Sequence, residues 1–271
     1  MKFKKTIAVV ITLLASAAVA FAIMVVALPH AKALNTSGIE AEPKPLHLTA
    51  IGDSLTHGVG DTTKQGGYVP LIAQDINIAT DCKVTTSNFG KTGDTALQIK
   101  HRLDKSTKIQ NDLSRADIIT VTAGGNDLMH LLQSNLLSIN TKDVNKGITK
   151  FQTHLTSLIT DIRRQNPNAP IYVFGIYNPF YVYFKNIPKM QDSVKRWNAR
   201  TQKTLAGMNN AYYVDIDGVL SKGNGTDKAK GSSTNSLIFG KDHFHPNNAG
   251  YVQMTAQLWD VMRSSKEKWE K

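Results

Sequence analysis

Four short polar clusters in the 271-residue chain combine a serine, histidines, carboxylates and an amide. The clusters are Gly52–Leu55, Asn88–Thr95, Gly124–Asp127 and Asp242–Pro246. Enzymatic acyl transfer needs a nucleophile, a base that takes its proton, an acid that orients the base, and N–H donors for the oxyanion. The clusters contain side chains for each task, so the sequence predicts a catalytic site if the fold brings them together.

Five residues in these clusters are the candidates for acyl transfer. Ser54 lies in a predicted strand-to-helix turn, with the helix N-terminus behind its N–H. Gly93 can bring its N–H close to a ligand because it has no Cβ, and Asn126 offers a side-chain amide of a type known to bind oxyanions. Asp242 and His245 are three residues apart, which puts them on one side of a helical turn. The carboxylate can therefore hold the imidazole.

Several of these residues also have a structural interpretation or a competitor. Ser54 alone could merely cap the following helix. Asp53 is predicted to order the turn rather than to take part in chemistry. His243 competes with His245 for the role of base, and the Asp-x-x-His-Pro spacing favours His245. Pro246 then begins the last helix at its first turn.

The elements that must position these clusters alternate along the chain. Short apolar runs predict strands at Leu46–Ile51, Lys83–Asn88, Asp117–Thr122, Pro170–Ile176 and Ala211–Ile216. Amphipathic stretches predict helices at Gly67–Ile78, Thr95–Leu103, Asp127–Ile139, Val144–Arg164, Lys189–Met208 and Asn247–Lys266. This alternation predicts an α/β fold with a five-stranded, mostly parallel sheet and helices on both faces. Ligands bind at the carboxyl ends of the strands in such sheets, where three of the clusters lie.

The N-terminal segment predicts export or anchoring. Met1–Lys5 is basic, and the apolar run Ile7–Leu28 is long enough to cross a hydrocarbon core of about 30 Å as a helix. Ala31–Ala33 resembles a small-x-small cleavage site. Residues 1–33 are therefore predicted to be a signal peptide or a transmembrane anchor, with the anchor slightly favoured. The basic start places the rest of the chain outside the cytoplasmic membrane, either anchored to the cell membrane or secreted. Residues 34–45 are predicted to be a linker, and 46–271 the catalytic domain.

Composition and charge exclude several classes of protein. The chain is 41% hydrophobic and 20% charged, which suits a packed core. Its single cysteine excludes an internal disulfide and a cysteine-based zinc cluster. The net charge is +11, but residues 1–33 hold four lysines and no acid, so 28 basic and 21 acidic residues remain. The lysines are mostly scattered, which argues against nucleic acid as a partner. No dinucleotide fingerprint follows the first strand.

Two segments are candidates for the walls of a substrate pocket. The stretch from Tyr177 to Phe184 is rich in aromatic residues, and Tyr177, Phe180 and Tyr181 are the predicted substrate-binding residues. A packed hairpin or helix start explains the same residues equally well. The apolar stretch Leu128–Leu137 is predicted to form the opposite wall.

The four clusters together resemble the conserved blocks of the GDSL esterases, also called SGNH hydrolases. Gly-Asp-Ser-Leu, Gly-Asp-Thr at 93–95, Gly-Gly-Asn-Asp and Asp-x-x-His-Pro occur in the family's order over roughly 46–266. The resemblance implies Ser54 as nucleophile, His245 as base and Asp242 as its partner. It also implies an oxyanion hole made by the N–H of Ser54 with Gly93 and Asn126. A flavodoxin-like three-layer α/β/α fold is implied, and the chain is most similar to small bacterial lysophospholipase/thioesterase-like acylhydrolases.

The sequence therefore predicts a serine hydrolase that cleaves carboxylic esters outside the cytoplasmic membrane. A small ester, a lipid or an acylated glycan is the expected substrate, and a monomer without metal or cofactor is the expected form. One alternative is a deacetylase of O-acetylated cell-wall glycan. Others are a non-catalytic wall-binding protein, and a metal-dependent phosphoesterase using Asp53, Asp242, His243 and His245. Hard-metal sites usually need more converging carboxylates and histidines.

Overall fold

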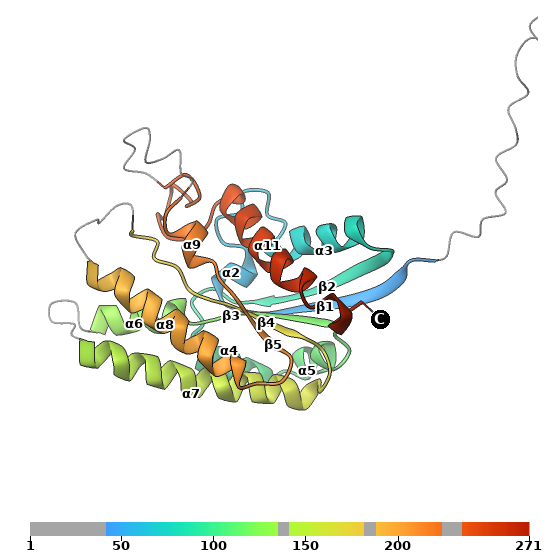
Figure 1. Cartoon of the computed structure of the whole chain (residues 1–271), viewed down its shortest axis with the longest axis horizontal. Coiled ribbons are helices and arrows are strands. Elements are labelled where there is room, and N and C mark those ends of the chain that lie inside the picture. Colours follow the sequence, from blue (N-terminus) through green and yellow to red (C-terminus); the bar gives the residue numbers. More distant parts are fainter. Residues whose placement is uncertain (1–41, 135–140, 182–187, 224–234, 271) are drawn as a thin grey trace, which may run out of the picture. The chain divides into compact units, whose positions relative to one another are not determined.

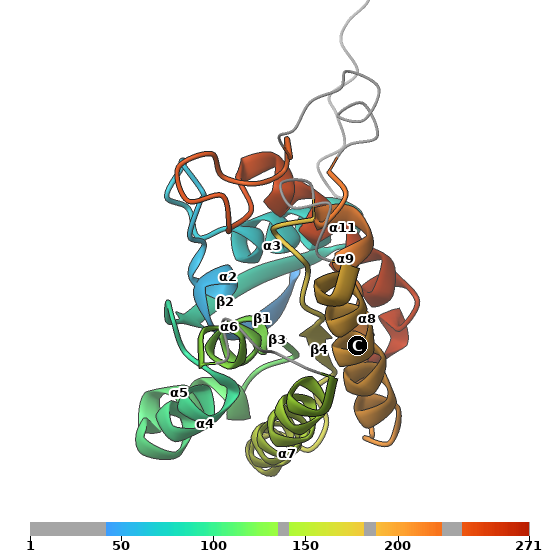
Figure 2. The same ribbon diagram turned by 90° about the vertical axis from the view of Figure 1, so that its left-hand side faces the viewer.

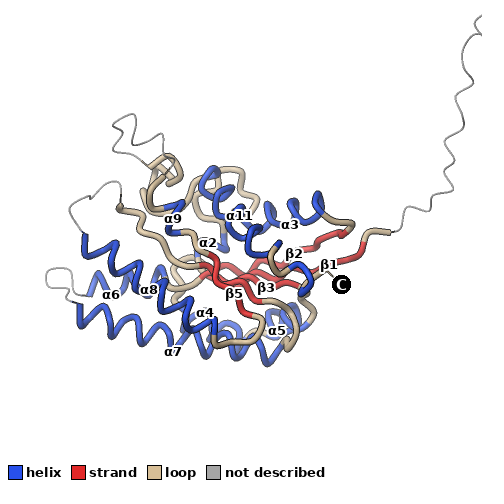
Figure 3. Tube along the Cα trace, viewed as in Figure 1, coloured by secondary structure: helices blue, strands red, loops and turns tan. Residues whose placement is uncertain are grey.

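A parallel sheet forms the centre of the molecule. The computed structural model describes residues 42–134, 141–181, 188–223 and 235–270. Within these ranges the strands are β1 (Lys44–Gly52), β2 (Cys82–Gly90), β3 (Ile118–Thr122), β4 (Ile171–Phe174) and β5 (Ala211–Val214). They form one sheet in the order β2-β1-β3-β4-β5, and every neighbouring pair is parallel (Figure 3). This strand order is that of flavodoxin-like sheets.

Helices cover both faces of the sheet (Figures 1 and 2). One face carries α4 (Ala96–Lys105), α5 (Thr107–Ser114), α6 (Gly125–Ser134), α7 (Thr141–Gln165) and α8 (Pro188–Ala206). The other carries α3 (Tyr68–Ala79), α9 (Asp217–Leu220), α11 (Asn248–Arg263) and the short 3₁₀ helix η1 (Lys266–Lys268). The four-residue helix α2 (Ser54–His57) directly follows β1. The α/β architecture and the parallel sheet predicted from the sequence are confirmed.

Two hydrophobic cores explain why both faces are covered. Successive side chains of a strand point to opposite faces. In β4, Ile171 and Val173 belong to the core under α7 and α8, whereas Tyr172 and Phe174 belong to the core under α11. All four side chains are buried. A strand buried on both faces reads as a continuous apolar run, which is the pattern that predicted it.

The predicted elements differ from the observed ones mainly at their ends. Strand β1 begins at Lys44 and so takes in two residues that were assigned to the linker; Lys44 pairs with Cys82 of β2. Helix α5 was not predicted. The side chain of its N-cap residue, Ser106, accepts the N–H of Ile109. Ser106 is also the C-cap residue of α4. One serine thus separates two helices, where the sequence pattern shows only a polar break.

The predicted signal or anchor at residues 1–33, and most of the linker, lie outside the described residues. Among the helices that the structure describes, none is long and apolar enough to cross a membrane.

The parallel register brings the polar clusters to one edge of the sheet. Gly52, at the end of β1, pairs with Gly90 of β2 on one side and with Thr122 of β3 on the other. A Cβ at Gly52 would lie 2.3 Å from Oγ1 of Thr122, so only glycine fits at this crossing. The segments that follow these three strand ends are therefore neighbours in space.

Candidate active site

Ser54 stands at the start of the short helix that follows β1. Asp53 is the N-cap of this helix, and its carboxylate accepts the N–H of Leu55 at 3.0 Å. The side chain of Asp53 thus orders the turn, as predicted. Ser54 is the first residue of the helix, so its N–H has no partner within the helix. Its side chain is largely buried beside the pocket described below.

The structure brings Ser54, His245 and Asp242 into one row. Nε2 of His245 is 2.8 Å from Oγ of Ser54, and Nδ1 of His245 is 2.7 Å from Oδ2 of Asp242. The other carboxylate oxygen, Oδ1 of Asp242, accepts the backbone N–H of Phe244 and of His245 at 2.9 and 3.1 Å. The carboxylate of Asp242 therefore holds both the backbone of residues 244 and 245 and the imidazole ring of His245. In this arrangement the imidazole can take the proton of the serine.

The environment of Asp242 keeps its carboxylate ionised. Partial burial acts to raise its pKa, but the hydrogen bonds from the His245 ring and from the N–H groups of Phe244 and His245 outweigh it. The pKa of Asp242 therefore lies below its ordinary value. An ionised carboxylate at Nδ1 favours the tautomer of His245 that leaves Nε2 free to accept a proton.

His243, the rival candidate for the base, is placed differently. It has a left-handed backbone conformation with φ of +53° and is exposed. The histidine that reaches Ser54 is His245.

Asn126 and Gly93 occupy different positions relative to the pocket. Asn126, in the first turn of α6, lines the pocket together with Ser54. One N–H of its amide donates to the carbonyl oxygen of Asp94 at 2.9 Å, which leaves the second N–H for a substrate oxygen. Gly93 is exposed and does not line the pocket. A Cβ there would meet nothing within 4 Å, but φ is +85°, so glycine is required by the backbone conformation.

An arginine that the sequence analysis did not single out holds the ends of β1 and β2 together. The guanidinium of Arg102 in α4 donates to the carbonyl oxygens of Gly52 at 2.8 Å and of Phe89 at 3.0 Å. Its Nε donates to the carboxylate of the buried Asp94 at 2.5 Å. This one side chain ties the loop that carries Gly93 to the strand that leads to Ser54. No local pattern distinguishes such an arginine from the other cations of an exposed helix.

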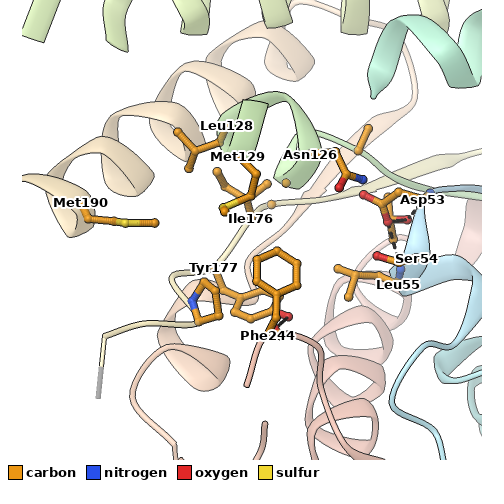
Figure 4. A pocket seen from close by; sticks show the side chains of 15 residues that line it. Asp53, Ser54, Leu55, Asn126, Leu128, Met129, Ile176, Tyr177, Met190 and Phe244 are labelled. Carbon is orange, nitrogen blue, oxygen red and sulfur yellow. Dashed lines mark hydrogen bonds between the residues drawn. The ribbon is translucent and has the colours of Figure 1, made fainter. Parts of the chain in front are cut away.

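An apolar pocket opens beside Ser54 (Figure 4). The empty space in it is about 560 Å³, which includes the part that opens to solvent. Its lining residues come from five segments of the chain: Asp53, Ser54, Leu55, Thr122, Ala123, Gly125, Asn126, Leu128, Met129, Gly175, Ile176, Tyr177, Pro179, Met190 and Phe244. Figure 4 shows Asp53, Ser54 and Asn126 at one end and Met190 at the other.

The structure places one of the three predicted substrate-binding residues in the lining of this pocket. Tyr177 lines the pocket, and its hydroxyl donates to the carbonyl oxygen of Phe244 at 2.6 Å. Phe180 and Tyr181 do not line it; the ring of Phe180 packs 6.2 Å from that of Phe244, centroid to centroid. The opposite wall was predicted at Leu128–Leu137, and Leu128 and Met129 form part of it.

The lining residues that were not predicted include Ile176, Met190 and Phe244. Phe244 occupies a variable position of the Asp-x-x-His-Pro block, and its ring packs edge-on against His245 with centroids 4.9 Å apart. The sequence signal for Phe244 is an aromatic residue directly before the candidate histidine His245. Met190 comes from α8, which is distant in sequence from every polar cluster.

The His, Cys, Asp and Glu side chains that the structure describes do not form a metal centre. Among the described residues, no three His, Cys, Asp or Glu side chains are grouped closely enough to hold a metal ion.

A parallel α/β sheet with a serine, a histidine and an aspartate in hydrogen-bonded order at its carboxyl edge defines the class of α/β serine hydrolases. Within that class, the sequence model of the GDSL-like lipase/acylhydrolase family matches residues 50–253. The chain belongs to this family and is a carboxylic ester hydrolase.

Two relatives and one solved structure are similar to this chain over most of its length. The Bacillus subtilis protein YpmR is 29% identical over 217 residues, which cover 80% of this chain and 81% of YpmR. The spore germination lipase LipC of Bacillus licheniformis is 24% identical over 217 residues, covering 79% of this chain and 94% of LipC. The crystal structure of the lipase Lip_vut3 from a goat rumen metagenome has the same fold, with a TM-score of 0.67 and 23% identity, and the match covers 80% of this chain and 97% of that one.

Proposed function

We propose that the protein hydrolyses esters of apolar acyl chains by acyl-enzyme chemistry, with Ser54 as nucleophile, His245 as general base and Asp242 as the orienting acid. The observation that carries this proposal is the 2.8 Å contact between Oγ of Ser54 and Nε2 of His245, in a row that continues to Asp242. A hydroxyl held at this distance from a neutral imidazole nitrogen is activated for attack on a carbonyl.

The proposed reaction has two halves. Oγ of Ser54 attacks the ester carbonyl carbon while its proton passes to Nε2 of His245, and the carbonyl oxygen becomes an oxyanion. The oxyanion binds the N–H of Ser54 and the second amide N–H of Asn126, with the N–H of Gly93 as the third proposed donor. His245 then protonates the leaving alkoxide. In the second half a water molecule attacks the acyl carbonyl and gives a proton to His245. His245 then returns a proton to Oγ of Ser54 as the bond between Oγ and the acyl group breaks and the carboxylic acid leaves.

The lining of the pocket favours an acyl chain over a small acetyl group. Leu128, Met129, Ile176 and Met190 present apolar surface that extends away from the end of the pocket that holds Ser54. Burying an acyl chain there contributes about 0.8 kcal/mol for each methylene removed from water. A lipid or lysophospholipid is therefore the proposed substrate class, and LipC is by its name a lipase. Removal of O-acetyl groups from cell-wall glycan is the alternative.

A panel of p-nitrophenyl esters from acetyl to long-chain acyl, run beside an O-acetylated glycan, tests this proposal. We expect kcat/KM to rise from acetate to medium chains. Met129 is half-buried in the pocket wall. Met129→Trp should therefore lower kcat/KM for the long esters and spare acetate, whereas Met129→Leu, of similar volume, should keep the parent profile. Highest activity on the glycan, with no gain from chain length, would favour the deacetylase alternative.

The proposed site of action is outside the cytoplasmic membrane. The basic start and the apolar run of residues 1–33 support anchoring or export. Fractionation of cells that produce the full chain, with protease added to intact cells, tests the location: the enzyme should be protease-accessible. A single species with the mass of one chain in light scattering would support the proposed monomer.

A further inference from the structure

The guanidinium of Arg102 contacts three separate acceptors beside the proposed oxyanion hole. Nη2 donates to the carbonyl oxygen of Gly52 at 2.8 Å, Nη1 to that of Phe89 at 3.0 Å, and Nε to Oδ2 of Asp94 at 2.5 Å. The side chain of Arg102 is 22% exposed and that of Asp94 is 6% exposed, so water has little access to this ion pair. Each bond uses a different nitrogen, and a planar guanidinium can make all three at once.

These acceptors belong to the two sides of the proposed oxyanion hole. Gly52 ends β1 two residues before Ser54, whose N–H is the proposed donor on one side. On the other side, the carbonyl oxygen of Asp94 accepts one amide N–H of Asn126 at 2.9 Å. Arg102 therefore joins, through direct bonds, the strand that leads to Ser54 and the residue that orients Asn126.

Two further bonds hold the ends of the segment that connects β2 to α4. The N–H of Lys91 donates to the carbonyl oxygen of the last residue of β1 at 3.0 Å. At the other end, Oδ2 of Asp127 accepts the N–H of Ala96 at 2.9 Å. The residue that Arg102 holds by its carboxylate lies between these ends, and it is the one that orients the amide of Asn126.

We propose that Arg102 is a positioning residue for the oxyanion hole, which fixes the side-chain amide of Asn126 relative to the N–H of Ser54. It does so from both sides, by holding the carboxylate of Asp94 and the carbonyl of Gly52. Donors stabilise an oxyanion when they lie at hydrogen-bond distance from the place that the oxygen takes in the transition state. A fixed separation between two donors therefore serves the chemical step more than substrate binding. The inference rests on the proposed roles of Ser54 and Asn126.

Arg102→Lys in the full-length chain tests this role. Lysine keeps the positive charge, but its donors lie on a single nitrogen, which cannot take the places of Nε, Nη1 and Nη2 at the same time. The amide of Asn126 is then still present but no longer fixed. We expect kcat to fall by about 10–100-fold, less than when a donor is removed outright, and KM to stay within about twofold. The assay is p-nitrophenyl butyrate hydrolysis, with rates expressed per serine labelled by a fluorophosphonate probe, so that unfolded protein does not count.

A double-mutant cycle with Asn126→Ala distinguishes positioning from a general structural effect. If Arg102 acts through the amide of Asn126, Arg102→Lys has little left to disturb once that amide is gone. Its loss of kcat should therefore shrink to about threefold or less in the Asn126→Ala background. A substitution that merely loosens the fold lowers activity by the same factor in both backgrounds, because independent effects add as free energies. Equal losses, an unchanged kcat or a loss confined to KM would overturn the proposal.

Arg163 in α7 provides a matched control. Its guanidinium also donates to backbone carbonyl oxygens, four of them, in residues 166–169 and 209–210 at 2.8 to 3.3 Å. These residues precede β4 and β5, at the opposite edge of the sheet from Ser54. Arg163→Lys should therefore lower Tm and keep the parent's kcat and KM. A fall in kcat equal to that of Arg102→Lys would show that loss of any such arginine impairs catalysis, and the proposal would be wrong.

Asp94→Asn is the second variant, and it replaces Arg102→Lys in the cycle if that protein does not fold, as judged by circular dichroism. It weakens the ion pair and keeps the backbone carbonyl that accepts the amide of Asn126. A smaller loss of kcat in the Asn126→Ala background supports the proposal, and equal losses overturn it. Near-normal kcat in Asn126→Ala alone would instead refute the proposed oxyanion hole, and ester turnover at the parent rate in Ser54→Ala would refute the proposed function. The failures are thus distinguishable.

Discussion

The side-chain amide of Asn126 offers the sharpest test of the proposed oxyanion hole. One N–H is held by the carbonyl oxygen of Asp94 at 2.9 Å, so the side chain is oriented before substrate binds. The other N–H is available in the pocket that contains Ser54. Asn126→Ala removes a donor whose bond strengthens as charge develops on the carbonyl oxygen. We expect kcat to fall by roughly 10²–10³, which corresponds to about 3–4 kcal/mol.

The same substitution should have a small effect on folding. The lost bond to Asp94 contributes about 0.5–1.5 kcal/mol to stability, and the half-buried position of Asn126 lets water reach the freed carbonyl. The large loss should therefore appear in kcat, with little change in KM, because the donor acts mainly in the transition state. Initial rates with p-nitrophenyl butyrate and a thermal melt measure the two effects separately.

Asn145→Ala is the matched control. This asparagine lies in α7, accepts a hydrogen bond from Arg196 at 3.2 Å and does not line the pocket. It should keep the parent's kcat. Near-normal kcat in Asn126→Ala, or a drop of equal size in Asn145→Ala, would refute the reasoning about the oxyanion hole.

Four other outcomes are expected. His245→Ala should lower kcat by several orders of magnitude, as in other enzymes that lose a member of a catalytic triad, whereas His243→Ala should cost about tenfold or less; equal losses would contradict the assignment of the base. Activity should survive EDTA, and a loss that zinc or manganese restores would favour the phosphoesterase alternative. A chain that begins near Asn35 should be soluble and active, since every catalytic cluster lies later; an inactive product beside an active full-length enzyme would count against this. The pKa of Asp61 lies below the ordinary value of 3.8, because five hydrogen bonds from the backbone and side chains of residues 63–67 outweigh its partial burial. Asp61→Ala should therefore lower Tm at neutral pH, and the difference should shrink as the pH falls below 3.8.

Local sequence patterns were enough to predict the fold and the candidate reacting residues. The apolar runs that became β1, β3 and β4 are buried on both faces, so their composition alone distinguishes them from exposed segments. Parallel strands end at one edge of a sheet, and this rule was enough to predict that Ser54 and Asn126 lie together. Asp242 and His245 are three residues apart, so their contact is also a local property of the chain.

The wall of the pocket and the support of the site depended on contacts between distant segments. Met190 reaches the pocket because α8 packs against β5 and α7, and the side chain of Arg102 contacts Gly52, fifty residues away in the sequence. Thr122 contacts Asp53 across a separation of 69 residues, and nothing in a strand sequence marks which hydroxyl will meet a carboxylate. Sequence patterns report which face of an element is buried. Only the packed structure decides which side chains share that interior, because the partner of each is set by the register and crossing of whole elements.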